Sequence, residues 1–510
     1  MKKLSAFAIL GLLVLGLAAT ASAAEIKATG KWQIEATMLQ GSDFLGKGAA
    51  SSEAKTFNIE QRMRTAFTFI ANENLKAVLD TQIGSANWGN GLYAIGAGRS
   101  TTSATTAGTS GGAGNGGAGN IMLRKGYIDF KWPGTKVNFL VGFQTVALPA
   151  AFGGGSAIID DQMAAAVMVT PLTDNLKLLA GYARPFDSNS SYSTTAGSLS
   201  GSGTSTDVVF AALPIDFKGV NVTPFAAYAN AGKDTYAAGT GATALAGFYG
   251  PNASANEGVR AYWGGAAATI TAFDGFKIMA DFNYGKASWN NQSGGNRADG
   301  GRSGWLADIA VDYTGLKMMT PSAFFVYSSG EKGNSTDGGS GGSGRMPLVA
   351  NPQNWAVGSF FFGDRDFVNG FPTNAGYVRN TLGFWAAGVS LKDITFIDKL
   401  KHTAHLMYVK GTNDKRFITE NGTTASGGIN ALNRAYYGAF LTEKDSLWEV
   451  DFNTKYQIYD ELSMYLNLGY INANFDKDVW GASSAANAGD ISAYGNKDAY
   501  RVGLGMAYSF

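Results

Sequence analysis

The chain lacks cysteine altogether and is poor in histidine and in charge. Without cysteine it can form neither a disulfide nor a thiolate metal site, and only two histidines are present. Charged residues make up 15% of the 510 residues, against roughly 25% in soluble domains. The net charge of +1 is far from the basic excess typical of nucleic-acid binders. Glycine is abundant instead, with 69 residues, and aromatics reach 12%.

Long apolar runs are also missing after the first residues. Lys2 and Lys3 precede the apolar stretch Leu4–Leu17, and Ala21-Ser22-Ala23 is a small-residue cleavage site. This pattern predicts a secretory signal peptide over residues 1–23, followed by a single exported domain over 24–510. A transmembrane anchor is disfavoured, because the apolar stretch is shorter than the ~20 residues of a spanning helix.

Period-2 alternation begins directly after the predicted cleavage site. Every second residue from Ile26 to Met38 is apolar or glycine, and the residues between them are charged or polar. Successive side chains of a strand point to opposite faces, so the pattern predicts a strand with one apolar and one charged face. A soluble β-sandwich also alternates in this way, so the organisation of the whole chain must decide.

Short and long connections alternate along the chain. The short ones carry turn chemistry and are residues 72–74, 133–135, 171–175, 216–219, 273–275, 314–315, 393–398 and 459–461. The long ones are polar or rich in glycine and are residues 39–55, 85–120, 146–161, 185–205, 231–258, 287–302, 329–378, 412–443 and 475–497. Compact soluble domains rarely contain so many long loops without secondary structure of their own. We therefore expect an all-β protein, a transmembrane antiparallel β-barrel of about 18 strands, with about 16 as the alternative, short periplasmic turns and long extracellular loops.

The chain ends on an alternating strand. Tyr500, Val502, Leu504, Met506, Tyr508 and Phe510 are apolar or aromatic at every second position. The pattern is similar to the terminal strand by which outer-membrane proteins are recognised for barrel insertion, with Tyr508 and Phe510 as its key residues. The alternative is an ordinary edge strand, which is an aggregation hazard in a soluble protein.

Charged residues on the polar strand faces are expected to line the lumen. Glu60, Arg62 and Arg64 share one face of the second predicted strand, and Lys125 and Asp129 share one face of the fourth. Charge on a lipid-facing position costs roughly 2–4 kcal/mol at the membrane midplane, whereas a watery lumen tolerates it.

The loop after the fifth predicted strand is more apolar than the others. It contains Phe152, Gly153 and Gly154 and ends at Asp160 and Asp161. An apolar loop exposed to water is disfavoured, so we expect it to fold inward. Its position resembles the constriction loop of general porins, which implies that the two acids face the basic wall carrying Arg62, Arg64 and Lys125. Alternatively, the acids only begin the sixth strand or bind a structural cation.

Several motifs resemble the homotrimeric outer-membrane porins of sulfate-reducing bacteria. The matching stretches are residues 124–130, 142–161, 182–185 and 344–347. The resemblance implies a homotrimer and general diffusion. The chain departs from the family pattern at Gly126, where alanine is expected, and in the glycine- and serine-rich loops 85–120 and 329–378.

The two histidines do not favour an enzyme. His402 and His405 are three residues apart, a spacing that on a strand points them to opposite faces, so they can neither share a metal nor act jointly. We therefore expect no catalytic residues, no metal and no cofactor.

The predicted function is an outer-membrane porin for passive diffusion of ions and small hydrophilic solutes. A substrate-specific channel, or a non-conducting barrel serving as surface receptor or adhesin, are the alternatives. The expected partners are the lipid bilayer with its lipopolysaccharide, the barrel-assembly machinery and further copies of the chain in a homotrimer, with no nucleic acid.

Overall fold

The structure, a computed structural model, describes eleven stretches of the chain. They are residues 25–41, 55–88, 121–187, 205–232, 258–289, 300–333, 344–349, 357–358, 383–416, 441–481 and 498–510. The predicted signal peptide lies outside the described residues, as do most of the predicted long loops.

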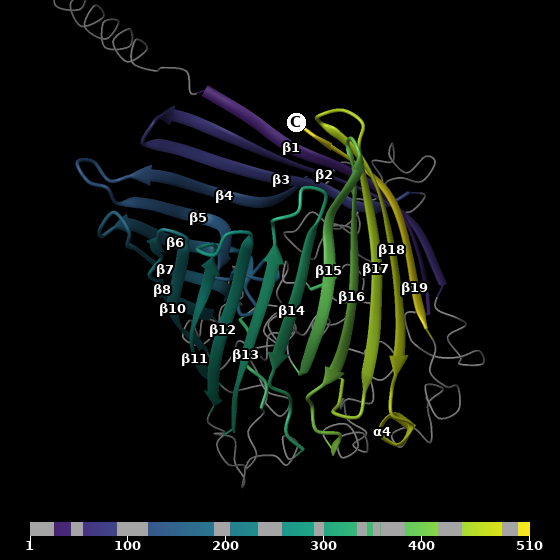
Figure 1. The fold of residues 1–510 in the computed structure, drawn as a ribbon. Helices are drawn as coiled ribbons and strands as arrows, with labels where there is room; N and C mark the ends of the chain where they lie inside the picture. The colour runs from purple at the N-terminus through teal and green to yellow at the C-terminus, as the bar shows by residue number, and fades with distance from the viewer. Residues whose placement is uncertain are drawn as a thin grey trace, which may run out of the picture.

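The described residues form one antiparallel sheet that closes on itself (Figure 1). Its strands are β1 (Glu25–Gln40), β2 (Lys55–Asn72), β3 (Leu75–Asn87), β4 (Ile121–Lys131), β5 (Asn138–Ala147), β6 (Asp160–Pro171), β7 (Lys177–Asp187), β8 (Ser205–Ala212), β9 (Ile215–Phe217), β10 (Val220–Ala231), β11 (Val259–Ile270), β12 (Phe276–Trp289), β13 (Gly300–Tyr313), β14 (Thr320–Ser328), β15 (Phe384–Ile397), β16 (Leu400–Gly411), β17 (Ser446–Gln457), β18 (Leu462–Asn474) and β19 (Ala499–Ser509). Apart from β8 and β9, each strand pairs with its neighbours in the chain, and β1 also pairs with β19, which closes the barrel.

The barrel has 18 strand positions, because β8 and β9 occupy one of them. Both pair with β10, and they are separated only by Leu213 and Pro214. Proline has no backbone N–H to donate to a sheet, which explains the interruption. The predicted barrel of about 18 strands is confirmed, and the alternative of 16 is excluded.

Connections of two lengths alternate around the ring, as predicted. Because consecutive strands are antiparallel, all short turns lie at one end of the barrel and all long connections at the other. One predicted turn, 393–398, is wrong in extent. β15 continues to Ile397 through irregular register between Leu391 and Ile397, and the turn is at Asp398 and Lys399. The polar sequence of 393–398 suggested a turn, but an irregular stretch of strand accommodates it, with Asp393 at a positive φ of 53°.

The two faces of the barrel wall differ in chemistry. In β1, Gln33 and Glu35 point inward and are buried, while Trp32 and Met38 are exposed on the outside. Large apolar side chains are exposed on the outside of most other strands too, including Phe282, Trp305 and Trp448. The side chains thus reverse the usual arrangement of a soluble protein, with charge inside and apolar rings outside.

Helical structure contributes little to the described part of the chain. The short helix α4 (Lys477–Gly481) follows β18. Within the described ranges, no helix combines the length and the apolar character needed to cross a membrane.

Candidate channel constriction

The loop between β5 and β6 comprises residues 148–159. We call it the constriction loop, after the role that the sequence predicts for it. The backbone N–H of Leu148 donates to the carbonyl of Ile159 at 3.2 Å, which closes the base of the loop. Ser156 Oγ accepts from the backbone N–H of Ile158 at 3.2 Å. Gly153 and Gly154 have φ of 77° and 82°, a conformation that side chains rarely adopt, so glycine is required for this reversal.

The constriction loop crosses the interior and docks on the far wall. Asp281 of β12 accepts hydrogen bonds from two consecutive backbone N–H groups, that of Ala151 at 2.8 Å and that of Phe152 at 2.8 Å. The ring of Phe152 packs on Phe324 of β14, with centroids 5.7 Å apart. The predicted inward fold of this loop agrees with these contacts.

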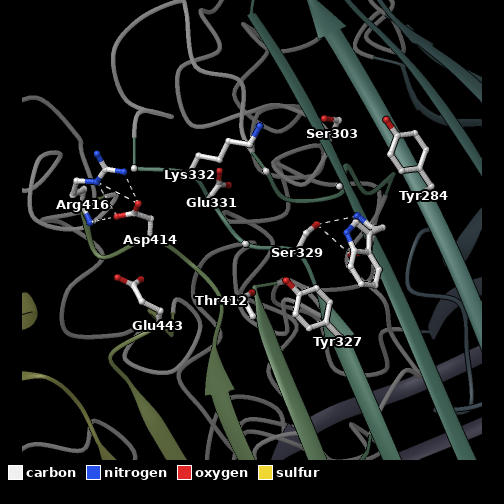
Figure 2. Close-up of a pocket in the computed structure, with 15 residues that line it drawn as sticks. Tyr284, Ser303, Tyr327, Ser329, Glu331, Lys332, Thr412, Asp414, Arg416 and Glu443 are labelled. Carbon is white, nitrogen blue, oxygen red and sulfur yellow. Dashed lines mark hydrogen bonds and ion pairs between the residues drawn. The ribbon is translucent and has the colours of Figure 1, made fainter.

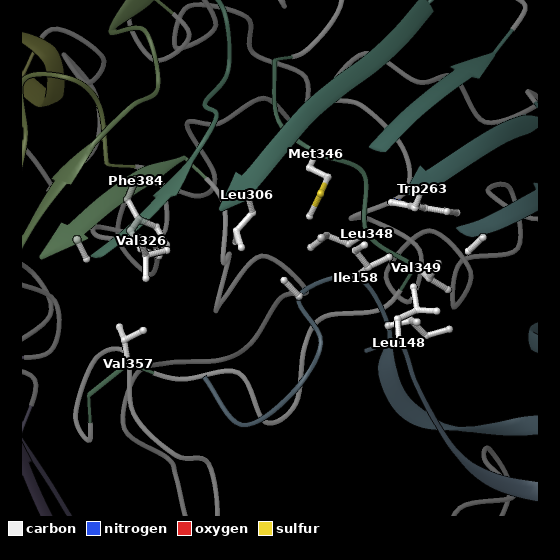
Figure 3. Close-up of a cluster of buried hydrophobic side chains, with 14 of the residues drawn as sticks. Leu148, Ile158, Trp263, Leu306, Val326, Met346, Leu348, Val349, Val357 and Phe384 are labelled. Carbon is white, nitrogen blue, oxygen red and sulfur yellow. The ribbon is translucent and has the colours of Figure 1, made fainter. Parts of the chain in front are cut away.

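A second inward segment, residues 344–349, completes the packing. The backbone N–H of Val349 donates to the carbonyl of Ile158 at 2.9 Å, and the indole Nε1 of Trp263 donates to the carbonyl of Pro347 at 2.7 Å. Met346 and Leu348 are fully buried in the resulting apolar cluster (Figure 3). The constriction loop and this segment therefore hold each other against β11–β14.

The sequence interpretation missed this second segment. It assigned 329–378 to an extracellular loop, whereas residues 344–349 pack inside the barrel. The available signal was the apolar run from Met346 to Val349 in an otherwise glycine- and serine-rich stretch. Glycine in the barrel wall leaves space for this segment. A Cβ at Gly304 would lie only 2.5 Å from the Met346 backbone nitrogen.

Another part of the interior, on β1–β4 and β19, also carries charged residues. Arg62 donates to Gln33 at 3.1 Å, and Arg64 donates to Gln82 at 2.8 Å. We define the charged wall as the inward charged residues of β1–β4 and β19, which are Glu35, Glu60, Arg62, Arg64, Asp80, Arg124, Lys125 and Arg501. It lies on different strands from the docking site of the constriction loop.

The charged wall is mixed in sign and includes charged residues beyond those predicted from the sequence. Asp80 pairs with both Arg124, at 3.2 Å, and Lys125, at 3.5 Å. Glu35 and Arg501 form a buried ion pair at 3.2 Å. These acids, together with Arg124 and Arg501, were not among the predicted site residues, because strand pairing across β1, β3, β4 and β19 brings them together.

Glu60 and Asp129 lie at different heights along the barrel axis. Glu60 lies opposite Glu35 in the register of β1 and β2. Asp129 lies near the short-turn end of β4 and pairs with Lys76 at 3.0 Å. Asp129 is thus separated from the arginines of the charged wall along the strand.

The paired acids after the constriction loop are the first two residues of β6. Asp161 is in register with Val146 and Asp160 with Ala147. Consecutive strand residues point to opposite faces, so the two carboxylates do not act as a pair from one face. A constriction role for either one stays a prediction.

The histidines are separated as predicted. His405 Nδ1 lies 2.7 Å from Ser390 Oγ, whereas the ring of His402 stacks on Phe452, a residue exposed on the outside. Among the described residues, no group of three or more potential metal ligands comes together.

A wide cavity of about 930 Å³ lies at the long-loop end of β12–β14 (Figure 2). Tyr284, Trp305 and Tyr327 form its aromatic side. On the other side Arg416 pairs with Asp414 at 2.7 Å, and hydrogen bonds from this guanidinium lower the pKa of the Asp414 carboxyl.

Fold and interior together define a closed antiparallel β-barrel of 18 strand positions, narrowed by folded-in segments. No protein-family model and no curated protein matches the chain. Among solved structures, OpdQ of Pseudomonas aeruginosa is similar at 14% identity and a TM-score of 0.48, over 95% of this chain and 98% of that one. OccAB3 of Acinetobacter baumannii is similar at 9% identity and a TM-score of 0.49, over 95% of this chain and 99% of that one.

Proposed function

We propose that the chain is a porin of the bacterial outer membrane, forming a water-filled channel for ions and small hydrophilic solutes. The observation that carries the proposal is the reversed side-chain arrangement of the barrel. Phe282 is 51% exposed and Trp448 48% exposed on the outside, whereas Glu35 and Arg501 are 3% and 5% exposed inside. An apolar outer surface suits a bilayer, and an ion-paired interior suits a wet lumen.

Barrel size supports a channel. Sixteen- to eighteen-stranded barrels leave an aqueous lumen unless something fills it. The constriction loop and residues 344–349 contact β11–β14, and we propose that the solute path runs between them and the charged wall. The constriction then sets the size of solutes, and the charges on both sides of the path screen them.

The homotrimer, the lipopolysaccharide contact and the barrel-assembly machinery also belong to this proposal. The family resemblance supports the trimer. Tyr508 and Phe510 support recognition by the assembly machinery, because their rings stack at the closing strand with centroids 5.7 Å apart. The aromatic rings outside β12–β17 support contact with the interfacial region of the membrane.

The test is conductance of the refolded protein in a planar bilayer, in KCl with a salt gradient. Discrete large steps, closing in thirds at high voltage, are the expected result for a trimeric porin. A correctly inserted but silent barrel contradicts the channel and favours the receptor or adhesin. Saturable block by one class of solute favours the substrate-specific channel.

A further inference from the structure

A cavity of about 300 Å³ lies inside the barrel, between the start of the constriction loop and the wall formed by β7–β11. Most of the residues that line it are apolar, among them Leu148, Pro149, Leu179, Phe210, Ala212 and Ala267. All the wall residues among these sit at inward-facing strand positions. The cavity is therefore part of the lumen and lies beside the constriction.

The apolar character of this wall contrasts with the charged wall on β1–β4. The ring of Phe210 lies against Gly181, where any Cβ would overlap it. Phe225 packs in the same way on Gly265 of β11. Apolar surface is not required to line a water-filled lumen. A concave apolar surface with a few polar groups is instead typical of small-molecule binding sites.

The polar groups lie together at one end of the cavity. Thr223 and Asn221 of β10 and Thr269 of β11 line it, and Thr269 is in register with Asn221. Asn221 is held by donating to Asp216. These residues are near the short-turn ends of their strands, so the cavity has an apolar end against the loop and a hydroxyl-bearing end toward that opening.

We propose that this cavity is a subsite for the apolar part of a permeating amphiphilic solute, one with an aliphatic or aromatic group next to a hydrogen-bonding head. The inference rests on the proposed channel function and narrows its solute class. The cavity holds the equivalent of about ten waters at ~30 Å³ each, which is room for a group the size of a leucine or phenylalanine side chain. A solute bound here lies beside the constriction loop and obstructs the ion path.

The test uses three zwitterionic amino acids as blockers of KCl current through the reconstituted protein. L-serine, L-leucine and L-phenylalanine carry the same head groups, so the charged wall affects them alike and only the side chain differs. We expect saturable block by leucine and phenylalanine at concentrations at least tenfold below that for serine. Equal block by all three overturns the subsite.

Two neighbouring residues of β11 give a matched pair of variants. Thr269→Phe fills the cavity, and we expect it to raise the half-blocking concentration of phenylalanine at least tenfold while KCl conductance persists. Ala268→Phe places the same ring on the outward face, and block should be unchanged. Thr223→Leu fills the cavity from β10. If Thr269→Phe does not fold, Thr223→Leu is used in its place, with the same expected rise in the half-blocking concentration of phenylalanine.

The outcomes separate the two proposals. A wild-type protein that folds and inserts but carries no current overturns the proposed function. Two outcomes overturn the subsite while the proposed porin function stands. In the first, the protein conducts but leucine and phenylalanine block no better than serine. In the second, their block persists in both Thr269→Phe and Thr223→Leu.

Discussion

The ring of Phe510 rests directly on Gly30, where the last strand of the barrel meets the first. The backbones of these two residues exchange two hydrogen bonds, from Gly30 N to Phe510 O at 2.8 Å and from Phe510 N to Gly30 O at 3.0 Å. A Cβ at Gly30 would overlap the Phe510 ring and lie 2.6 Å from the carbonyl oxygen of Arg64. The terminal residue thus closes the barrel at a site that only glycine fits.

Gly30→Val should therefore weaken barrel closure. Overpacking of this kind costs roughly 1–3 kcal/mol, because backbone cannot move aside as a flexible side chain can. We expect a lower folded fraction and a lower unfolding temperature, measured by heat-modifiable migration on gels. Gly126→Ala is the control, since its nearest neighbour would be a Leu123 methyl at 3.7 Å. Equal stability of both variants contradicts the closure role.

Asp281→Ala should release the constriction loop from the far wall. The carboxylate accepts from Ala151 and Phe152, and hydrogen bonds to a charged group are worth roughly 1.5–3 kcal/mol each. The expected result is a larger, noisier single-channel conductance. Lys286→Ala, on the outer face of β12, should leave the conductance as it is. If Asp281→Ala conducts like the wild type, the apolar cluster around Ile158 alone holds the loop.

Arg62→Gln combined with Arg64→Gln should shift selectivity toward cations. In water, the interaction energy between a unit charge and an ion about 4 Å away is roughly 1 kcal/mol. This energy corresponds to about a fivefold change in the permeability ratio. The reversal potential under a KCl gradient measures it. Lys401→Gln, at the exposed short-turn end of β16, serves as the control. An unchanged reversal potential would place the ion path away from the charged wall.

Asp160→Asn with Asp161→Asn should shift selectivity toward anions if these acids line the constriction. Because consecutive residues of β6 point to opposite faces, the single variants are expected to differ, and one of them should account for most of the shift. Reversal potentials of both single variants and the double variant make the comparison. A double variant that behaves like the wild type removes both acids from the constriction.

Lowering the pH should destabilise the segment of residues 412–416, which contains Asp414. The Arg416 guanidinium lowers the pKa of this carboxyl in the folded state, so its stabilising contact is present above the unfolded pKa and is lost as the pH falls through the folded value. Hydrogen exchange of residues 412–416 should accelerate over that acidic range. In Asp414→Asn it should be fast at every pH and lose this pH dependence, whereas an unaltered profile would contradict the role of the pair.

Local sequence was sufficient to predict the barrel. The alternation from Ile26 to Met38, the turn residues between strands and the alternating residues up to Phe510 are all patterns of neighbouring residues. The period of two fixes which side chains share a face, and that assigned Glu60, Arg62 and Arg64 to the interior. The misplaced turn at 393–398 shows the limit, because an irregular strand and a turn use the same polar residues.

The composition of the interior could not be predicted in the same way. Asp281 became a loop anchor because β12 stands across the barrel from residues 151 and 152, a separation of 129 positions in the chain for Phe152. The buried pair of Glu35 and Arg501 joins the two ends of the sequence, 466 residues apart. No local pattern carries such information.

The sequence by itself determined that this protein is a β-barrel with an apolar exterior and a charged interior, because strand geometry converts a period of two directly into two faces. Only the tertiary structure decided what occupies the interior. Closure of β1 on β19 sets which strands face one another across the lumen, and that arrangement selects the partners of the constriction loop, the mixed signs of the charged wall and the apolar cavity beside it.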